Sequence, residues 1–101
     1  MKYCIVERRF GGRPIIVGSE PLPGILLTDA LYPAWSYETA TPMLVSEADT
    51  DFWADVVEVS GAEKAIIVRT LGGEAGVQAL LRDAVRLHER LSREYAEKRR
   101  A

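Results

Sequence analysis

The end of the chain carries the strongest structural signal in the sequence, because its apolar residues recur at the spacing of one helix face. In GVQALLRDAVRLHERLSREYAEKRR the intervals are four and three residues. The positions on this face are Val77, Leu81, Ala84, His88, Leu91 and Tyr95. The pattern predicts a long amphipathic helix over residues 74–97. One side of this helix has to pack against another apolar layer, which the rest of the chain must supply.

The start of the chain predicts that layer. KYCIVER reads as a strand with apolar residues on both faces, since Tyr3 and Ile5 alternate with Cys4 and Val6. RRFGGR supplies glycines for a reversal, and PIIVG reads as the returning strand, with Pro14 at its first residue, where a missing N–H matters least. We therefore expect a β-hairpin over residues 1–18.

The segment that follows gives no regular pattern. EPLPG interrupts the chain, and GILLT reads either as a short strand or as a single helical turn. DALYPAWSYETATP contains two prolines and three aromatic residues and fits neither period. We expect an irregular Pro/aromatic segment over residues 19–45, within which a short element is not excluded.

Residues 46–70 allow two interpretations. Ser46 followed by Asp49 resembles a capping box, and residues 47–59 separate apolar from acidic positions at the helical period. Against a helix, VVEV, SGAE and KAIIV would form a hairpin with a four-residue turn. The better helical segregation favours a helix over about 47–59 and a buried strand at KAIIVRT. LGGEAG then reads as the turn into the last helix.

These segments predict one α+β domain over residues 1–101. It has a small sheet that starts with the N-terminal hairpin, a middle helix, and the long C-terminal helix packed on the sheet. A chain of 101 residues is a typical length for a single hydrophobic core. No apolar run approaches the about 20 residues of a membrane span, and MKYCIVERRF is too polar for a secretory signal. The expected location is the cytoplasm.

Charge is distributed unevenly along the chain. Residues 14–63 contain no lysine or arginine, whereas basic residues outnumber acidic ones in residues 1–13 and 82–100. The acids of this middle block are Glu20, Asp29, Glu38, Glu47, Asp49, Asp51, Asp55, Glu58 and Glu63. Such an asymmetry indicates a partner with a basic surface.

No motif predicts a reaction, and we expect no catalytic residue, metal or cofactor. Cys4 beside His88 would make a thiol nucleophile, but no third group supports the pair, and we favour a neutral histidine with one hydrogen bond in the core or at a subunit seam. The carboxylates of residues 47–55 could hold Mg²⁺ or Ca²⁺, yet their spacing is not that of an EF-hand. LGGEAG lacks the lysine of a phosphate-binding loop.

The polar face of the C-terminal helix suggests two further interactions. Several arginines on one side could neutralise nucleic-acid phosphates, but acids alternate with them and the sequence pI of about 5.4 is far from basic. We therefore do not expect nucleic acid as the partner. The long apolar stripe is compatible with a homo-oligomer formed through this helix. The arginines are Arg82, Arg86, Arg90 and Arg93.

The aromatic residues of DALYPAWSYETATP carry the functional hypothesis. Their side chains either anchor a partner or fill the core beneath a loop. We hypothesise a non-enzymatic interaction module, such as a small regulator or inhibitor, that binds a basic protein. A small enzyme using Cys4 and His88 or the 47–55 carboxylates is the first alternative, and a nucleic-acid-binding accessory domain is the second. The predicted partner-binding residues are Tyr32, Trp35, Tyr37, Asp29, Glu38, Glu47, Asp49, Asp51 and Asp55.

Overall fold

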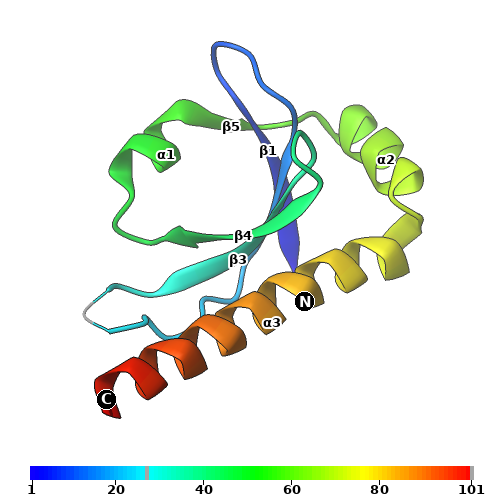
Figure 1. Ribbon diagram of the computed structural model, residues 1–101. Coiled ribbons are helices and arrows are strands. Elements are labelled where there is room, and N and C mark those ends of the chain that lie inside the picture. Colours follow the sequence, from blue (N-terminus) through cyan, green and yellow to red (C-terminus); the bar gives the residue numbers. More distant parts are fainter. Residues whose placement is uncertain (27, 101) are drawn as a thin grey trace.

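The computed structural model describes residues 1–26 and 28–100, in which a twisted antiparallel sheet is flanked by helices (Figure 1). The strands lie in the order β4-β3-β2-β1-β5. The N-terminal hairpin, the middle helix and the long C-terminal helix on the sheet confirm the predicted α+β class. The elements are β1 (Tyr3–Arg8), β2 (Ile15–Gly18), β3 (Leu31–Ser36), β4 (Thr41–Ser46), α1 (Thr50–Asp55), β5 (Val56–Glu58), α2 (Gly61–Thr70) and α3 (Gly73–Arg100).

The two faces of the sheet form two separate apolar clusters. Strand alternation sends Ile16 to one face and Ile15 and Val17 to the other. On the first face α2 and α3 cover the cluster, which contains Ile5, Ile16, Trp35, Val59, Ile67, Val77 and Leu81. On the second face α1 is the one helix of the described residues that contributes, through Phe52, to a cluster of Val6, Ile15, Val17, Ala34 and Val45. One face is therefore closed and the other is partly open.

Helix α3 follows the predicted apolar stripe and packs on β3, β4 and β2. Val77, Leu81 and Ala84 are buried, whereas the residues beyond them are partly or fully exposed. In Figure 1 the helix runs beneath the sheet as a single long rod. Its first half is therefore part of the core, and its second half borders solvent. Among the described residues, none of the helices contains an apolar stretch long enough to cross a membrane.

The prediction of an irregular segment over residues 19–45 is wrong for its second half, which contains β3 and all of β4 except Ser46. Both strands contain a proline, and the register explains why. The Glu47 N–H donates to the Ala30 carbonyl at 2.8 Å, so by alternation the Pro42 nitrogen faces away from β3, on an edge strand. Pro33 lies where the pairing with β2 has ended at Val17 and Ala34. Pro42 therefore removes no hydrogen bond of the β3–β4 ladder, and Pro33 marks the end of the β2–β3 ladder.

The prediction of a helix over residues 47–59 is correct only for its central part, residues 50–55. The side chain of Asp49, rather than of Ser46, accepts the N-terminal hydrogen bond of α1, from the Phe52 N–H at 3.1 Å. The helix ends at Asp55, and Val56 is extended, with φ −110° and ψ 147°. The β-branched residues that followed then pair with β1 as strand β5. The helix interpretation is right for residues 50–55, whereas the hairpin interpretation is right only in making residues 56–58 a strand, because that strand pairs with β1 and not with KAIIV.

The buried strand predicted at KAIIVRT is wrong, because these residues lie in α2. The helix begins at a cap, where the Ser60 hydroxyl accepts the Glu63 N–H at 3.2 Å. It ends before Gly72 and Gly73, whose φ values of 95° and 77° allow the sharp turn into α3. A capped start and a glycine stop thus outweigh the strand preference of the Ile-Ile-Val run.

Candidate functional site

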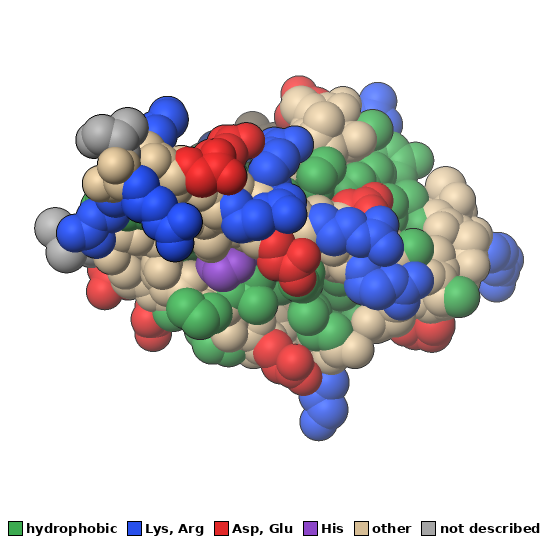
Figure 2. Space-filling view, turned by 60° about the horizontal axis from the view of Figure 1, so that its bottom comes forward, with side chains coloured by type: hydrophobic (Ala, Val, Ile, Leu, Met, Phe, Trp, Pro, Cys, Tyr) green, Lys and Arg blue, Asp and Glu red, His purple; other side chains and the backbone are tan. Residues whose placement is uncertain are grey.

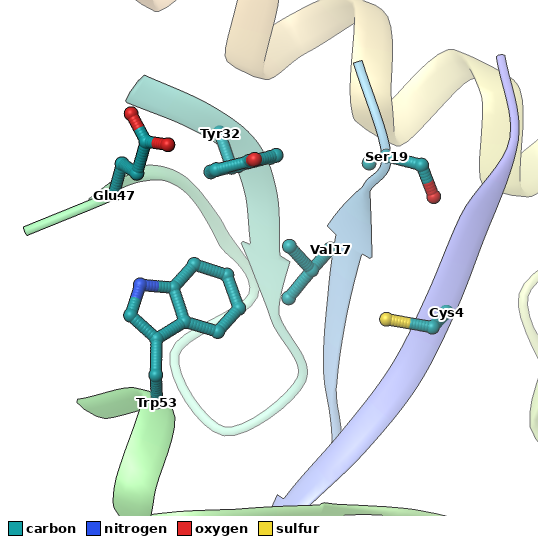
Figure 3. A pocket seen from close by; sticks show the side chains of 7 residues that line it. Cys4, Val17, Ser19, Tyr32, Glu47 and Trp53 are labelled. Carbon is teal, nitrogen blue, oxygen red and sulfur yellow. The ribbon is translucent and has the colours of Figure 1, made fainter. Parts of the chain in front are cut away.

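A pocket of about 430 Å³ opens on the sheet face that α1 only partly covers. Cys4 from β1, Val17 from β2, Tyr32 from β3 and Trp53 from α1 point into the same space (Figure 3). We call it the open-face pocket. Its lining residues are Cys4, Val17, Gly18, Ser19, Tyr32, Glu47 and Trp53.

The aromatic wall of this pocket is built by two different elements. Strand alternation puts Tyr32 on the open face, and α1 brings Trp53 against it. The two rings meet edge to face, with centroids 5.4 Å apart and an interplanar angle of 77°. The Trp53 Nε1–H also donates to the Ser46 carbonyl at 2.9 Å. The Phe52 ring meets the same indole edge to face, with the ring centroids 5.1 Å apart. Trp53 is therefore held in place without a ligand.

Gly18, which lines the pocket at the end of β2, also marks a close approach on the opposite face of the sheet. A Cβ atom on Gly18 would lie 2.6 Å from the Met1 sulfur and 3.0 Å from Cγ of Pro33. Only glycine lets β2 end here with the neighbouring strand so near. By strand alternation a side chain at this position would point to the closed face, opposite Val17, so the close approach sets how β2 ends and not the size of the pocket.

The charge of the pocket is one-sided. Glu47 lies at the rim of the pocket, and none of the lining residues is a lysine, an arginine or a histidine (Figure 3). Burial, and to a smaller extent the Glu58 carboxylate, raises the pKa of the Cys4 thiol. The thiol therefore stays protonated, which does not suit a nucleophile. Two aromatic rings beside a carboxylate instead favour a cationic group of a ligand.

Three of the predicted acids lie on the other side of α1. Asp49, Asp51 and Asp55 line a second pocket of about 470 Å³, together with Phe52. We call it the acid-lined pocket. Asp49 caps α1, and an Asp55 carboxylate oxygen lies 3.6 Å from Arg8 Nη1. These acids therefore flank the open-face pocket without lining it.

The structure separates the remaining predicted residues from the pocket. Trp35 has an exposed fraction of 8% and lies in the cluster on the closed face, so it is part of the core. Tyr37 contacts it edge to face at 6.0 Å, and Glu38 is exposed at the turn between β3 and β4. Asp29 is exposed just ahead of β3, at the end of the hairpin where Glu47 lies. Of the nine predicted partner-binding residues, two line the open-face pocket, namely Tyr32 and Glu47.

Cys4 and His88 do not form a pair. Cys4 belongs to the open-face cluster, whereas His88 lies on α3, which packs on the opposite face. The His88 Nε2 atom is 2.6 Å from the Pro23 carbonyl oxygen, to which it donates. Within the described ranges, no group of three His, Cys, Asp or Glu side chains is placed to bind a metal ion.

The arginine face of α3 is a mixed surface. Figure 2 shows basic and acidic side chains alternating over this helix. Arg86 pairs with Asp83 at 3.4 Å, and Arg90 pairs with Glu94 at 3.8 Å. Because neighbouring acids offset these charges, the face lacks the uniform positive potential of a nucleic-acid site.

Sequence reasoning did not single out Trp53 or Cys4 as residues of a binding pocket. Phe52 and Trp53 both pack against the open-face cluster, Phe52 buried and Trp53 half-buried, so no local signal in the sequence tells the pocket-lining ring from the core one. Comparison with known proteins finds no matching family model, no matching curated protein and no matching solved structure. The role of the open-face pocket must follow from its geometry and charge.

Proposed function

We propose that the protein is a non-enzymatic interaction module that binds a basic protein partner through the open-face pocket. One observation carries the proposal. The Tyr32 and Trp53 rings stand beside Glu47 in a pocket whose lining residues include no base. A lysine or arginine side chain would gain both a carboxylate partner and an aromatic face there.

The pocket also has the features of an interface anchor point. Tyrosine and tryptophan bury large surfaces at low entropic cost, and here Trp53 is already fixed by the hydrogen bond to Ser46. Val17 and Cys4 give an apolar floor beside the rings. The ligand that fits is a segment carrying an apolar side chain next to a basic one.

The acids around α1 add long-range attraction. Asp49 and Asp51 are exposed beside the open-face pocket and would raise the association rate of a basic partner. A module of this kind acts as a regulator or inhibitor when it covers its partner's basic surface. We also propose the cytoplasm as its location, where Cys4, the chain's single cysteine, would remain reduced.

The proposal is tested by titrating the protein with short fluorescent peptides of equal length. One peptide alternates aromatic and basic residues, one replaces the basic residues with acidic ones, and one replaces them with serine. We expect the basic peptide to bind best and its affinity to fall as salt is added. Glu47→Lys should weaken it about tenfold or more.

The matched control is Glu38→Lys, which makes the same charge change on the same hairpin but away from the pocket. It should leave the affinity for the basic peptide nearly unchanged. Equal losses in the two variants would mean that net charge, and not the pocket, governs binding. Equal affinity for the acidic and basic peptides would refute the proposal.

A further inference from the structure

The turn between β1 and β2 exposes an aromatic side chain among arginines. Residues 8–13, which we call the hairpin tip, read RRFGGR and contain no acid. Phe10 has an exposed fraction of 95%, the largest among the exposed large hydrophobic side chains described. In Figure 1 the tip projects from the body of the molecule. It presents an apolar side chain next to basic ones.

The hairpin tip is held in position by α1. The Arg9 backbone N–H donates to the Asp55 carbonyl at 2.8 Å, and the Arg9 side-chain Nε–H donates to the Ala54 carbonyl at 3.1 Å. The Arg8 guanidinium pairs with the Asp55 carboxylate. Binding through the tip would therefore cost little conformational entropy.

We propose that the hairpin tip of a second copy of this chain occupies the open-face pocket. The inference rests on the proposed function, because it names the partner of the same site. Phe10 of one copy packs on Val17 and Cys4 of the other. Arg13 is the arginine of the tip that α1 does not hold, and it lies against Tyr32 and Trp53 of the other copy and pairs with Glu47. The tip contains bases without an acid, and the pocket lining contains an acid without a base.

The location of the two surfaces suits a symmetric exchange. The pocket lies where β1 begins and β2 ends, whereas the tip joins the other ends of the same strands. The six residues of β1 separate them by about 20 Å, at about 3.3 Å per residue. Two hairpins related by a twofold axis and running antiparallel would therefore place each tip in the other's pocket. Both contacts then form at once.

Sedimentation velocity over a range of protein concentrations tests this exchange. We expect reversible association of the wild type that weakens at high salt. Phe10→Ser should raise the dissociation constant about tenfold or more, which corresponds to about 1.4 kcal/mol. The control is Ile66→Ser, which removes another exposed apolar side chain, on α2 (63% exposed). It should leave association unchanged, and both variants should fold, since neither side chain is in the core.

A mixing experiment distinguishes the exchange from a general loss of association. Phe10→Ser has an intact pocket, and Glu47→Lys has an intact tip. Each variant alone should sediment mainly as a monomer. An equimolar mixture should form a heterodimer through the one remaining tip and pocket, with an affinity between those of the wild type and the single variants.

Several results would overturn the exchange. These are a wild type that stays monomeric at every concentration and salt, a mixture that associates no better than its components, or equal effects of Phe10→Ser and Ile66→Ser. Dissociation by Leu91→Glu but not by Phe10→Ser would assign self-association to α3 instead. The proposed function is separable, because Phe10→Ser keeps the pocket and should still bind the basic peptide. Loss of that peptide binding in Glu47→Lys does not depend on the oligomeric state.

Discussion

The two faces of the sheet contain comparable apolar clusters but differ in what covers them. The closed face lies under α2 and the 28-residue helix α3, whereas in the part of the chain that the structure describes the open face is covered by one helix, the six-residue α1. Along β3 this difference separates neighbouring aromatic residues. Trp35 points to the closed face and is core, and Tyr32 points to the open face and lines a pocket. Aromatic content alone therefore does not locate a binding surface, because the covering layer decides what each ring does.

The largest difference in stability is expected between Trp35→Ala, on the closed face, and Tyr32→Ala, on the open face. Removing Trp35 leaves a cavity in the closed-face core and should lower the free energy of unfolding by about 3–5 kcal/mol. Tyr32→Ala loses mainly the edge-to-face contact with Trp53 and partly exposed area, so about 1–2 kcal/mol is expected. Urea denaturation of both variants gives the difference. Equal losses would show that the open face is as tightly packed as the closed one.

A second test compares the two halves of α3. Leu81, with an exposed fraction of 1%, lies in the closed-face core, and Leu81→Ala should cost about 2–5 kcal/mol. Leu91 is only partly buried, and Leu91→Ala should cost about 1 kcal/mol. Thermal and urea unfolding measure both. A cost for Leu91 close to that of Leu81 would extend the core along the whole helix.

The parts of the fold with a complete local signal could be predicted from the sequence. The periodic stripe predicted α3, and alternation around a glycine turn predicted the β1–β2 hairpin. The strands β3 and β4 were missed because a proline usually argues against a strand. Only the register shows that Pro42 lies on an edge with its nitrogen turned outward. That information is tertiary and is not present in the segment itself.

The wrong prediction of a strand at helix α2 has a different cause, because the signal for the helix was present in the sequence. Ser60 and Glu63 have the spacing of a capping box, but the β-branched run after them was given more weight. For the site, the acids and Tyr32 were recognisable by type. Their grouping was not, because it depends on which face of β3 each side chain occupies and on where α1 brings Trp53.

A third test asks how far the open face depends on the start of α1. Asp49→Ala removes the cap of this six-residue helix and should lower the free energy of unfolding by about 1 kcal/mol. Because α1 carries Trp53, the variant should also bind the basic peptide more weakly. The control is Asp51→Ala, which removes an exposed acid of the same helix and should change stability by less than about 0.5 kcal/mol. Equal losses of stability in Asp49→Ala and Asp51→Ala would show that the Asp49 cap does not stabilise α1.

The smallest effect concerns the rim of the closed face, where the Tyr3 hydroxyl donates to Glu74 at 2.7 Å. Partial burial, together with this hydrogen bond to Glu74 and its charge, raises the pKa of Tyr3 to about 12 from its ordinary value of 10.0. The unfolded chain therefore loses its Tyr3 proton at lower pH than the folded protein does. The contribution of Tyr3 to stability is fully present below pH 10 and is lost as the pH rises toward 12. Urea unfolding across this range should show a steeper loss in the wild type than in Tyr3→Phe, which has no phenolic proton. Equal slopes of stability against pH in the wild type and Tyr3→Phe would show that the hydrogen bond from Tyr3 to Glu74 makes no net contribution to stability. The packing of α3 on the sheet would then depend on the apolar cluster alone.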